Sequence, residues 1–171
     1  MKTRDIVIAL FILLLTVTLA YVWISPASHQ APELSLTTAT GKQLHIGSKQ
    51  TRPVLVNLWA TSCTSCIKEI PHLSKLYQDL KPQGLEVVGI SMYYDPPNQV
   101  MEMVKRKTIP YSIVFDLDRK IINAFGIKSP ITPTTMLINS DGQIVYRKIG
   151  LPDMKYLRSL IIPMLENHQK G

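Results

Sequence analysis

The chain alternates between short apolar runs of strand length and longer segments with helical periodicity. Residues 54–59, Val-Leu-Val-Asn-Leu-Trp, form a nearly continuous apolar run, as expected of a central strand buried on both faces. The next segment, from Cys63 to about Leu80, carries an apolar stripe at helical spacing: Cys66, Ile70, Leu73, Tyr77 and Leu80. By the same criteria we expect strands at 85–92, 113–115, 134–138 and 143–148, and helices at 98–107, 119–125 and 153–167.

Two hairpins are also expected. Segments 34–37 and 43–46 flank Thr-Gly-Lys, and segments 134–138 and 143–148 flank an Asp-Gly turn. After the first hairpin, the predicted elements follow the order β-α-β-α-β-α-β-β-α. This order predicts one α/β domain with a mixed central sheet flanked by helices and an N-terminal β-hairpin extension.

The N-terminal segment 6–24 is apolar and carries no charge. Its nineteen residues would span about 28 Å as a helix, enough to cross the hydrocarbon core of a bilayer. Tyr21 and Trp23 lie at its far end, where aromatic rings favour the membrane interface, and Lys2 and Arg4 favour the cytoplasm for the near end. We therefore expect an uncleaved transmembrane helix.

A cleaved signal peptide is the alternative. Its apolar core is normally shorter, and no clean Ala-X-Ala site follows in residues 25–31. In both cases the rest of the chain is exported. With the anchor retained, we expect a single-pass protein of the bacterial inner (cytoplasmic) membrane with its folded domain on the periplasmic or extracytoplasmic side. The expected divisions are a cytoplasmic segment 1–5, an anchor 6–24, a linker 25–31 and a folded domain 32–171.

The charge of the exported part argues against nucleic acid as a partner. The chain has 19 basic and 12 acidic residues, of which only Lys2, Arg4 and Asp5 precede the apolar segment, so a net charge of about +6 remains. The basic residues are scattered, with one tight run at 105–107, and no aromatic residues are interleaved with them. Solvated helix faces explain this pattern.

Cys63 and Cys66 are the only cysteines, and they lie three residues apart where a strand gives way to a helix. One helical turn separates them, so both sulfurs can lie close enough to form a disulfide. A helix N-terminus carries partial positive charge and free N–H groups, which stabilise a thiolate and lower the thiol pKa. Because the thiolate is the nucleophile in disulfide exchange, the pattern is typical of a redox-active dithiol.

The two cysteines are not expected to be equivalent. Cys63 lies at the start of the helix, where solvent can reach it, whereas Cys66 belongs to the apolar stripe. We therefore expect Cys63 to be the nucleophile and Cys66 the resolving thiol.

Other uses of a cysteine pair fit less well. A structural disulfide across three residues closes too small a loop to stabilise much. A zinc site would need two more ligands, and the four histidines form no pair at ligand spacing. Covalent haem would need a histidine at position 67, which is Ile67. No metal or cofactor is expected.

Three stretches resemble the TlpA/ResA-like membrane-anchored thioredoxin family: Val-Asn-Leu-Trp-Ala-Thr at 56–61, Cys-Thr-Ser-Cys-Ile-Lys-Glu-Ile-Pro at 63–71 and Thr-Pro-Thr-Thr-Met-Leu-Ile-Asn at 132–139. The resemblance covers roughly residues 31–167. It implies a thioredoxin fold and a thiol–disulfide oxidoreductase.

The resemblance also implies further site residues. It implies a cis peptide at Thr132–Pro133, beside the cysteines, where the Thr132 backbone could pair with an extended substrate. An ordinary trans turn proline is the alternative. Glu69 matches a carboxylate that tunes the thiols in family members, and burial would raise its pKa; a solvated helix glutamate is the alternative. Trp59 and Ser62, which precede the first cysteine, are also expected to contact substrate.

The chain departs from its relatives near the cysteines. Thioredoxins usually place Trp directly before the first cysteine, where this chain has Ser62, and Thr64-Ser65 between the cysteines contains neither Gly nor Pro. Both changes affect the reduction potential. The segment before Pro133 lacks the Gly-Val-Tyr-Gly-Ala-Pro-Glu pattern of dedicated cytochrome-maturation thioredoxins, so apocytochrome c is one candidate substrate among several.

We expect a membrane-anchored reductase of disulfides in exported proteins, recharged by a membrane thiol–disulfide electron donor. A disulfide oxidant or isomerase is the main alternative. A copper chaperone would use Cys63, Cys66 and a methionine such as Met92 or Met136, although core methionines are common gap-fillers. A peroxidase is disfavoured, because Cys63 lacks the Pro-X-X-X-Thr-X-X-Cys spacing.

Overall fold

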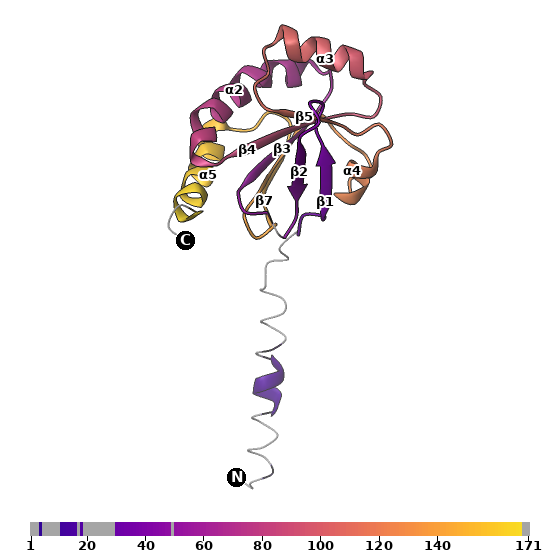
Figure 1. Ribbon diagram of the computed structural model, residues 1–171. Helices are drawn as coiled ribbons and strands as arrows, with labels where there is room; N and C mark the ends of the chain where they lie inside the picture. The colour runs from indigo at the N-terminus through magenta and orange to yellow at the C-terminus, as the bar shows by residue number, and fades with distance from the viewer. Residues whose placement is uncertain (1–3, 5–10, 17, 19–29, 49, 169–171) are drawn as a thin grey trace.

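The computed structural model describes residues 4, 11–16, 18, 30–48 and 50–168 (Figure 1). Most of the predicted anchor at 6–24 lies outside the described residues. Within it, residues 11–16 are helical, and the large apolar side chains from Phe11 to Leu15 are exposed. Among the residues described, no helix combines the length and the apolar character needed to cross a membrane.

The elements confirm the predicted order, and their bounds differ from the predicted ones by one residue at most. The strands are β1 (Leu34–Thr37), β2 (Gln43–Ile46), β3 (Val54–Trp59), β4 (Glu86–Ser91), β5 (Ser112–Phe115), β6 (Thr134–Ile138) and β7 (Ile144–Ile149). The helices are α2 (Thr64–Leu80), the 3-10 turn η1 (Lys81–Gln83), α3 (Pro97–Arg106), α4 (Lys120–Ala124) and α5 (Met154–His168).

The central sheet has the strand order β5-β4-β3-β6-β7, and β1 and β2 form a separate antiparallel pair. Strands β3, β4 and β5 are parallel, whereas β6 is antiparallel to β3 and to β7. Because Leu58 near the end of β3 pairs with Thr134 at the start of β6, the loop before β6 meets the turn after β3. This register brings residues 132–133 to the same end of the sheet as the cysteines, which follow β3.

Strand β3 separates two hydrophobic layers because its side chains alternate between the faces of the sheet. Leu55 and Trp59 pack with buried residues of α2, α3 and α5. Val56 and Leu58 pack on the other face with residues of the β1–β2 hairpin and α4. Figure 1 shows α2 and α5 together on one side and α4 with the hairpin on the other. The buried stripe predicted for α2 is confirmed.

The folded domain includes two residues that the sequence assigned to the linker. Gln30 forms an isolated antiparallel bridge with Gln143, and the Ala31 amide donates to the Gly142 carbonyl at 2.8 Å. Ala31 is buried. This contact lies at the β6–β7 turn, at the opposite end of β6 from Thr134. The chain therefore enters the domain at the end of the sheet opposite the cysteines.

Candidate active site

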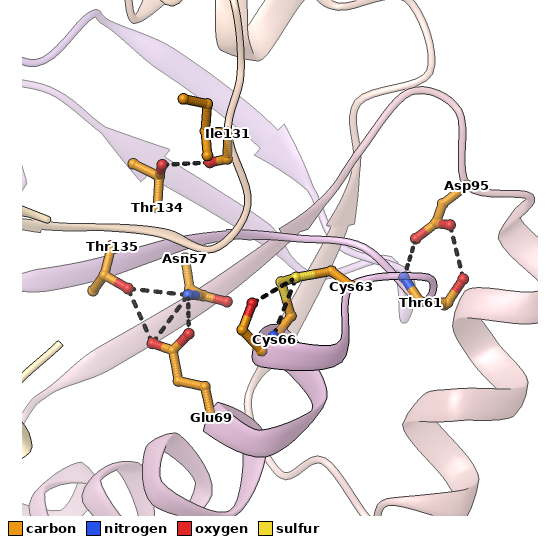
Figure 2. Close-up of a disulfide and its surroundings, with 10 residues drawn as sticks. Asn57, Thr61, Cys63, Cys66, Glu69, Asp95, Ile131, Thr134 and Thr135 are labelled. Atoms are coloured by element: carbon orange, nitrogen blue, oxygen red, sulfur yellow. Dashed lines mark hydrogen bonds between the residues drawn. A yellow bond between two sulfur atoms is a disulfide. The ribbon is translucent and has the colours of Figure 1, made fainter. Parts of the chain in front are cut away.

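Cys63 and Cys66 form a disulfide at the start of α2, with Cα atoms 5.2 Å apart (Figure 2). Cys63 is the N-cap of the helix, and its sulfur accepts a hydrogen bond from the Cys66 amide at 3.1 Å. The Ser65 hydroxyl lies 3.4 Å from the same sulfur. Helix N-terminal amides are unpaired within the helix, so this one is free to stabilise negative charge on Cys63 after reduction.

Solvent access differs sharply between the two sulfurs. The Cys66 side chain belongs to the hydrophobic core, with 2% of the residue exposed, whereas Cys63 is half-buried at the surface. A protein substrate can therefore approach Cys63, while Cys66 is shielded behind it.

Glu69 lies one turn after Cys66 and faces the core, with 2% of the residue exposed. Its carboxylate accepts hydrogen bonds from the Thr135 hydroxyl at 3.1 Å and from the Asn57 amide group at 3.4 Å (Figure 2). Asn57 also donates to the Thr135 hydroxyl oxygen at 3.1 Å. Burial raises the pKa of Glu69 to about 7, against the opposing effect of these hydrogen bonds.

Glu69 is among the residues that line a hollow of about 510 Å³. The hollow lies between the first turns of α2 and the loop that precedes α5, and Lys68, His72, Leu151 and Asp153 also line it. A carboxyl group with a pKa near 7 can gain and lose a proton near neutral pH, which suits it chemically to proton transfer.

The Thr132–Pro133 peptide bond is cis. Pro133 is buried and Thr132 is half-buried, and the Pro133 carbonyl accepts a hydrogen bond from the Gly150 amide at 2.8 Å. The Thr134 hydroxyl donates to the Ile131 carbonyl at 2.5 Å, which holds the loop on both sides of the proline. The loop thus lies at the sheet edge beside the cysteines, where an extended substrate could reach it.

Trp59 and Ser62 lie in different environments. Ser62 is exposed beside Cys63, but Trp59 is 2% exposed and packs in the core under α2. A Cβ atom at Gly89 would lie 3.1 Å from the Trp59 Nε1, so the glycine of β4 makes room for the indole. The sequence led us to expect a contact between Trp59 and substrate, but Trp59 lies in the hydrophobic core. The alternation of side chains along β3 turns it inward.

Three polar residues at the site received no role from the sequence: Asn57, Thr135 and Asp95. Asn57 is the single polar residue of β3, and a polar side chain in a buried strand must find partners there. Thr135 follows the cis proline in a strand whose residues are all buried. Asp95 is 4% exposed, and its carboxylate binds Thr61 two residues before Cys63. Asn57 could have been recognised in the sequence, because it is an isolated polar residue in an apolar run.

Met92 and Met136, the methionines considered for copper, are fully buried in the hydrophobic layer on the hairpin side of the sheet. Within the described part of the chain, no three His, Cys, Asp or Glu side chains are arranged to hold a metal ion. The surroundings of the two methionines are those of side chains that fill core space.

Comparison with known proteins identifies relatives of this chain. The AhpC/TSA family matches residues 27–147. The thiol-disulfide oxidoreductase ResA of Halalkalibacterium halodurans is 35% identical over 119 residues, which cover 70% of this chain and 66% of the relative. ResA of Bacillus subtilis is 32% identical over 115 residues, covering 67% of this chain and 63% of the relative. The aligned region thus spans just under two thirds of these relatives.

Solved structures agree with the fold. A thiol:disulfide interchange protein of the thioredoxin family from Chlorobium tepidum superposes with a TM-score of 0.71 at 23% identity, covering 82% of this chain and 99% of that one. At this level of identity the likeness concerns the fold, which is the thioredoxin fold.

Proposed function

Because this chain belongs to the AhpC/TSA family and has the thioredoxin fold, we propose that it is a thiol–disulfide oxidoreductase of the ResA type. The observation that carries the proposal is the Cys63–Cys66 disulfide at the start of α2, with one sulfur at the surface and the other in the core. This is the arrangement that disulfide exchange requires: a nucleophile that a partner can reach and a second thiol that is held beside it.

The reaction transfers two electrons from the reduced pair to a substrate disulfide. The Cys63 thiolate attacks one substrate sulfur, which forms a mixed disulfide and expels the other substrate sulfur as a thiolate that takes up a proton. Cys66 then loses its proton and attacks the Cys63 sulfur. The second substrate sulfur leaves as a thiolate that takes up a proton, and the Cys63–Cys66 disulfide remains. We assign the removal of the Cys66 proton to Glu69, because its carboxyl group lies one helical turn away and titrates near neutral pH.

Substrate binding is assigned to the cis-proline loop and Ser62. The register of β3 and β6 supports this assignment, because it brings the segment before β6 to the end of the sheet where the cysteines lie, and an extended substrate segment could pair there with the Thr132 backbone as an added strand. Ser62 is exposed beside Cys63 and contributes a small polar rim. A substrate cysteine presented in this way would meet the exposed sulfur.

The proposed direction of electron transfer is reduction of the substrate. The proposed location is the bacterial inner membrane, where segment 6–24 would hold the protein with its folded domain on the periplasmic side. It would reduce disulfides of exported proteins, with apocytochrome c among the candidates, and receive electrons from a membrane thiol–disulfide donor. The uncharged apolar length of 6–24 and the two preceding basic residues support the anchor. The entry of the chain opposite the cysteines would turn the active site away from the membrane.

Trapping of the mixed disulfide tests the reaction. In Cys66→Ala the second attack is missing, so insulin and exported client proteins should remain linked to Cys63 and be released by reductant. Cys63→Ala is the matched control and should trap nothing. Trapping by Cys63→Ala instead would reverse the two roles. If neither variant traps a partner and the unmodified pair binds Cu(I) tightly, the oxidoreductase proposal fails.

Equilibration with glutathione tests the direction. A reduction potential near roughly −270 mV, the value for thioredoxin, supports a reductase, and one near roughly −120 mV, the value for DsbA, supports the oxidant alternative.

Fractionation tests the anchor. The tagged full-length protein should sediment with membranes and resist high-salt and carbonate washes, because a spanning apolar helix is not released by either treatment. A soluble product that begins near residue 28 would show that the segment is a cleaved signal.

A further inference from the structure

Asp95 is a buried carboxylate beside the active-site turn that the proposed reaction does not use. The residue is 4% exposed and lies between β4 and α3. Both of its oxygens bind one residue: Oδ2 accepts from the Thr61 amide at 2.6 Å, and Oδ1 accepts from the Thr61 hydroxyl at 2.8 Å (Figure 2). Burying a carboxylate costs free energy unless hydrogen bonds compensate. Because both compensating bonds of Asp95 go to Thr61, the role of Asp95 concerns that residue.

Thr61 lies in the short connection that sets the position of Cys63. Only Ala60, Thr61 and Ser62 separate the end of β3 from Cys63. The Cys63 amide donates to the Ala60 carbonyl at 3.1 Å, which closes a turn with Thr61 and Ser62 at its centre. The amide of Thr61 takes no part in that bond and is satisfied by the carboxylate instead. The turn is therefore held from outside by Asp95.

The loop that carries the carboxylate is itself firmly attached. The Asp95 amide donates to the Met92 carbonyl at 2.9 Å, and the Met92 amide donates to the Trp59 carbonyl at 3.1 Å. Pro96 and Pro97 follow directly, and proline fixes the backbone dihedral φ. The carboxylate thus has a fixed position relative to the end of β3. Through its two hydrogen bonds to Thr61, it restrains the position of the turn.

We propose that Asp95 is a positioning residue of the dithiol: by holding Thr61 through both oxygens, it fixes the turn that places the Cys63 sulfur at the N-cap of α2. There the Cys66 amide donates to the sulfur. The inference rests on the proposed function. In Figure 2, Asp95 and Glu69 lie on opposite sides of the cysteine pair, so the two carboxylates act on the site from different directions.

Two substitutions of Asp95 separate the hydrogen bonds from the charge. Asp95→Ala removes both bonds. In Asp95→Asn the amide oxygen can accept from the Thr61 N–H while the NH₂ group donates to the Thr61 hydroxyl oxygen, so both contacts survive without the charge. Since a small misplacement of a reacting atom is costly, Asp95→Ala should slow alkylation of reduced Cys63 and insulin reduction by about tenfold or more. Asp95→Asn should restore both rates to within about threefold of the unmodified protein.

Asp116 offers a matched control for lost stability. It is 1% exposed, and its oxygens accept from the Ile121 and Ile122 amides at 2.8 and 3.0 Å, at the start of α4. Asp116→Ala should lower the melting temperature but leave the alkylation rate of Cys63 unchanged. The inference is overturned if Asp95→Ala reacts as fast as the unmodified protein, if Asp95→Asn is as slow as Asp95→Ala, or if Asp116→Ala slows Cys63 equally.

Thr61 provides the same test if Asp95→Ala does not fold. Thr61→Val removes the hydroxyl bond and keeps the amide bond, and it should slow Cys63 several-fold, whereas Thr61→Ser should restore the rate. Equal rates for both variants would overturn the inference. The assays also separate the two proposals: an unmodified protein that is alkylated at Cys63 but reduces no disulfide contradicts the oxidoreductase function, while the alkylation rates still decide the role of Asp95.

Discussion

The first two turns of α2 offer a negative charge opposite environments on their two sides. On the solvent side, the half-buried Cys63 sulfur accepts a hydrogen bond from a helix N-terminal amide, which favours a thiolate. On the core side, Cys66 and Glu69 are each 2% exposed, and burial there penalises a negative charge. Under the proposed function, this contrast would keep Cys63 ready to attack and Cys66 protonated until a base removes its proton.

Exchange of each cysteine for serine should give the largest difference between the two sides. Cys63→Ser should lower the rate of insulin reduction by about three orders of magnitude or more, because the nucleophile is lost. In the reduced unmodified protein, mass spectrometry should find alkylation at Cys63 before Cys66, and the Cys63 thiolate should form at a pH below about 8.5, where a free cysteine ordinarily titrates. Cys66→Ser is the matched control and should leave Cys63 reactive. Equal alkylation of both cysteines would remove the distinction between the two sides.

The second test removes the charge on the core side. The pKa of Glu69 is raised from 4.5 to about 7 on folding, so between these values the folded state binds a proton that the unfolded state has lost. The contribution of Glu69 to the stability of the oxidised protein should therefore fall by about 3 kcal/mol as the pH rises from about 4.5 to above 7. Glu69→Gln should abolish this slope in urea unfolding, and in the reduced protein it should shift the pH dependence of thiol reactivity.

Glu102→Gln is the surface control for this prediction. The Glu102 side chain is 75% exposed on α3, so its removal should leave the slope as it is in the unmodified protein. Superimposable pH profiles for Glu69→Gln and the unmodified protein would instead make Glu69 an ordinary helix glutamate.

A smaller effect is expected from the groups that hold Glu69. The Thr135 hydroxyl stabilises the ionised carboxylate, so Thr135→Val should raise the pKa of Glu69 further. The ¹³C chemical shift of the carboxyl carbon, followed against pH in the oxidised protein, measures this change. Thr135→Ser keeps the hydroxyl and should titrate like the unmodified protein. A pKa that stays constant or falls in Thr135→Val would show that the hydrogen bond does not act on the ionised form.

Much of the fold could be predicted from local pattern. The apolar run of β3, the stripe of α2 and the Asp-Gly turn before β7 each encode one element, because a strand buries every second side chain or both faces and a helix buries residues three or four apart. The same periodicity predicted that Cys66 is buried and Cys63 is not. Trp59 was the exception: its place near the motif suggested the surface, but its place in the strand decided the core.

The surroundings of the cysteines could not be predicted in the same way. Glu69 meets Thr135 across 66 residues of chain, and Thr61 meets Asp95 across 34. No periodicity links such positions, since the contacts arise only after β6 pairs beside β3 and the β4–α3 loop packs on the turn after β3.

Local sequence was therefore enough to predict two thiols on one helical turn, one facing solvent and one in an apolar stripe. The surroundings of these thiols arise only when distant segments pack together. Packing buries Glu69 against Asn57 and Thr135, holds Thr61 on Asp95 and brings the segment before β6 to the end of the sheet where the cysteines lie. The physical reason is that helix and strand periodicity depends on neighbours a few residues apart, whereas burial and hydrogen bonding of a side chain depend on whichever distant segments pack against it.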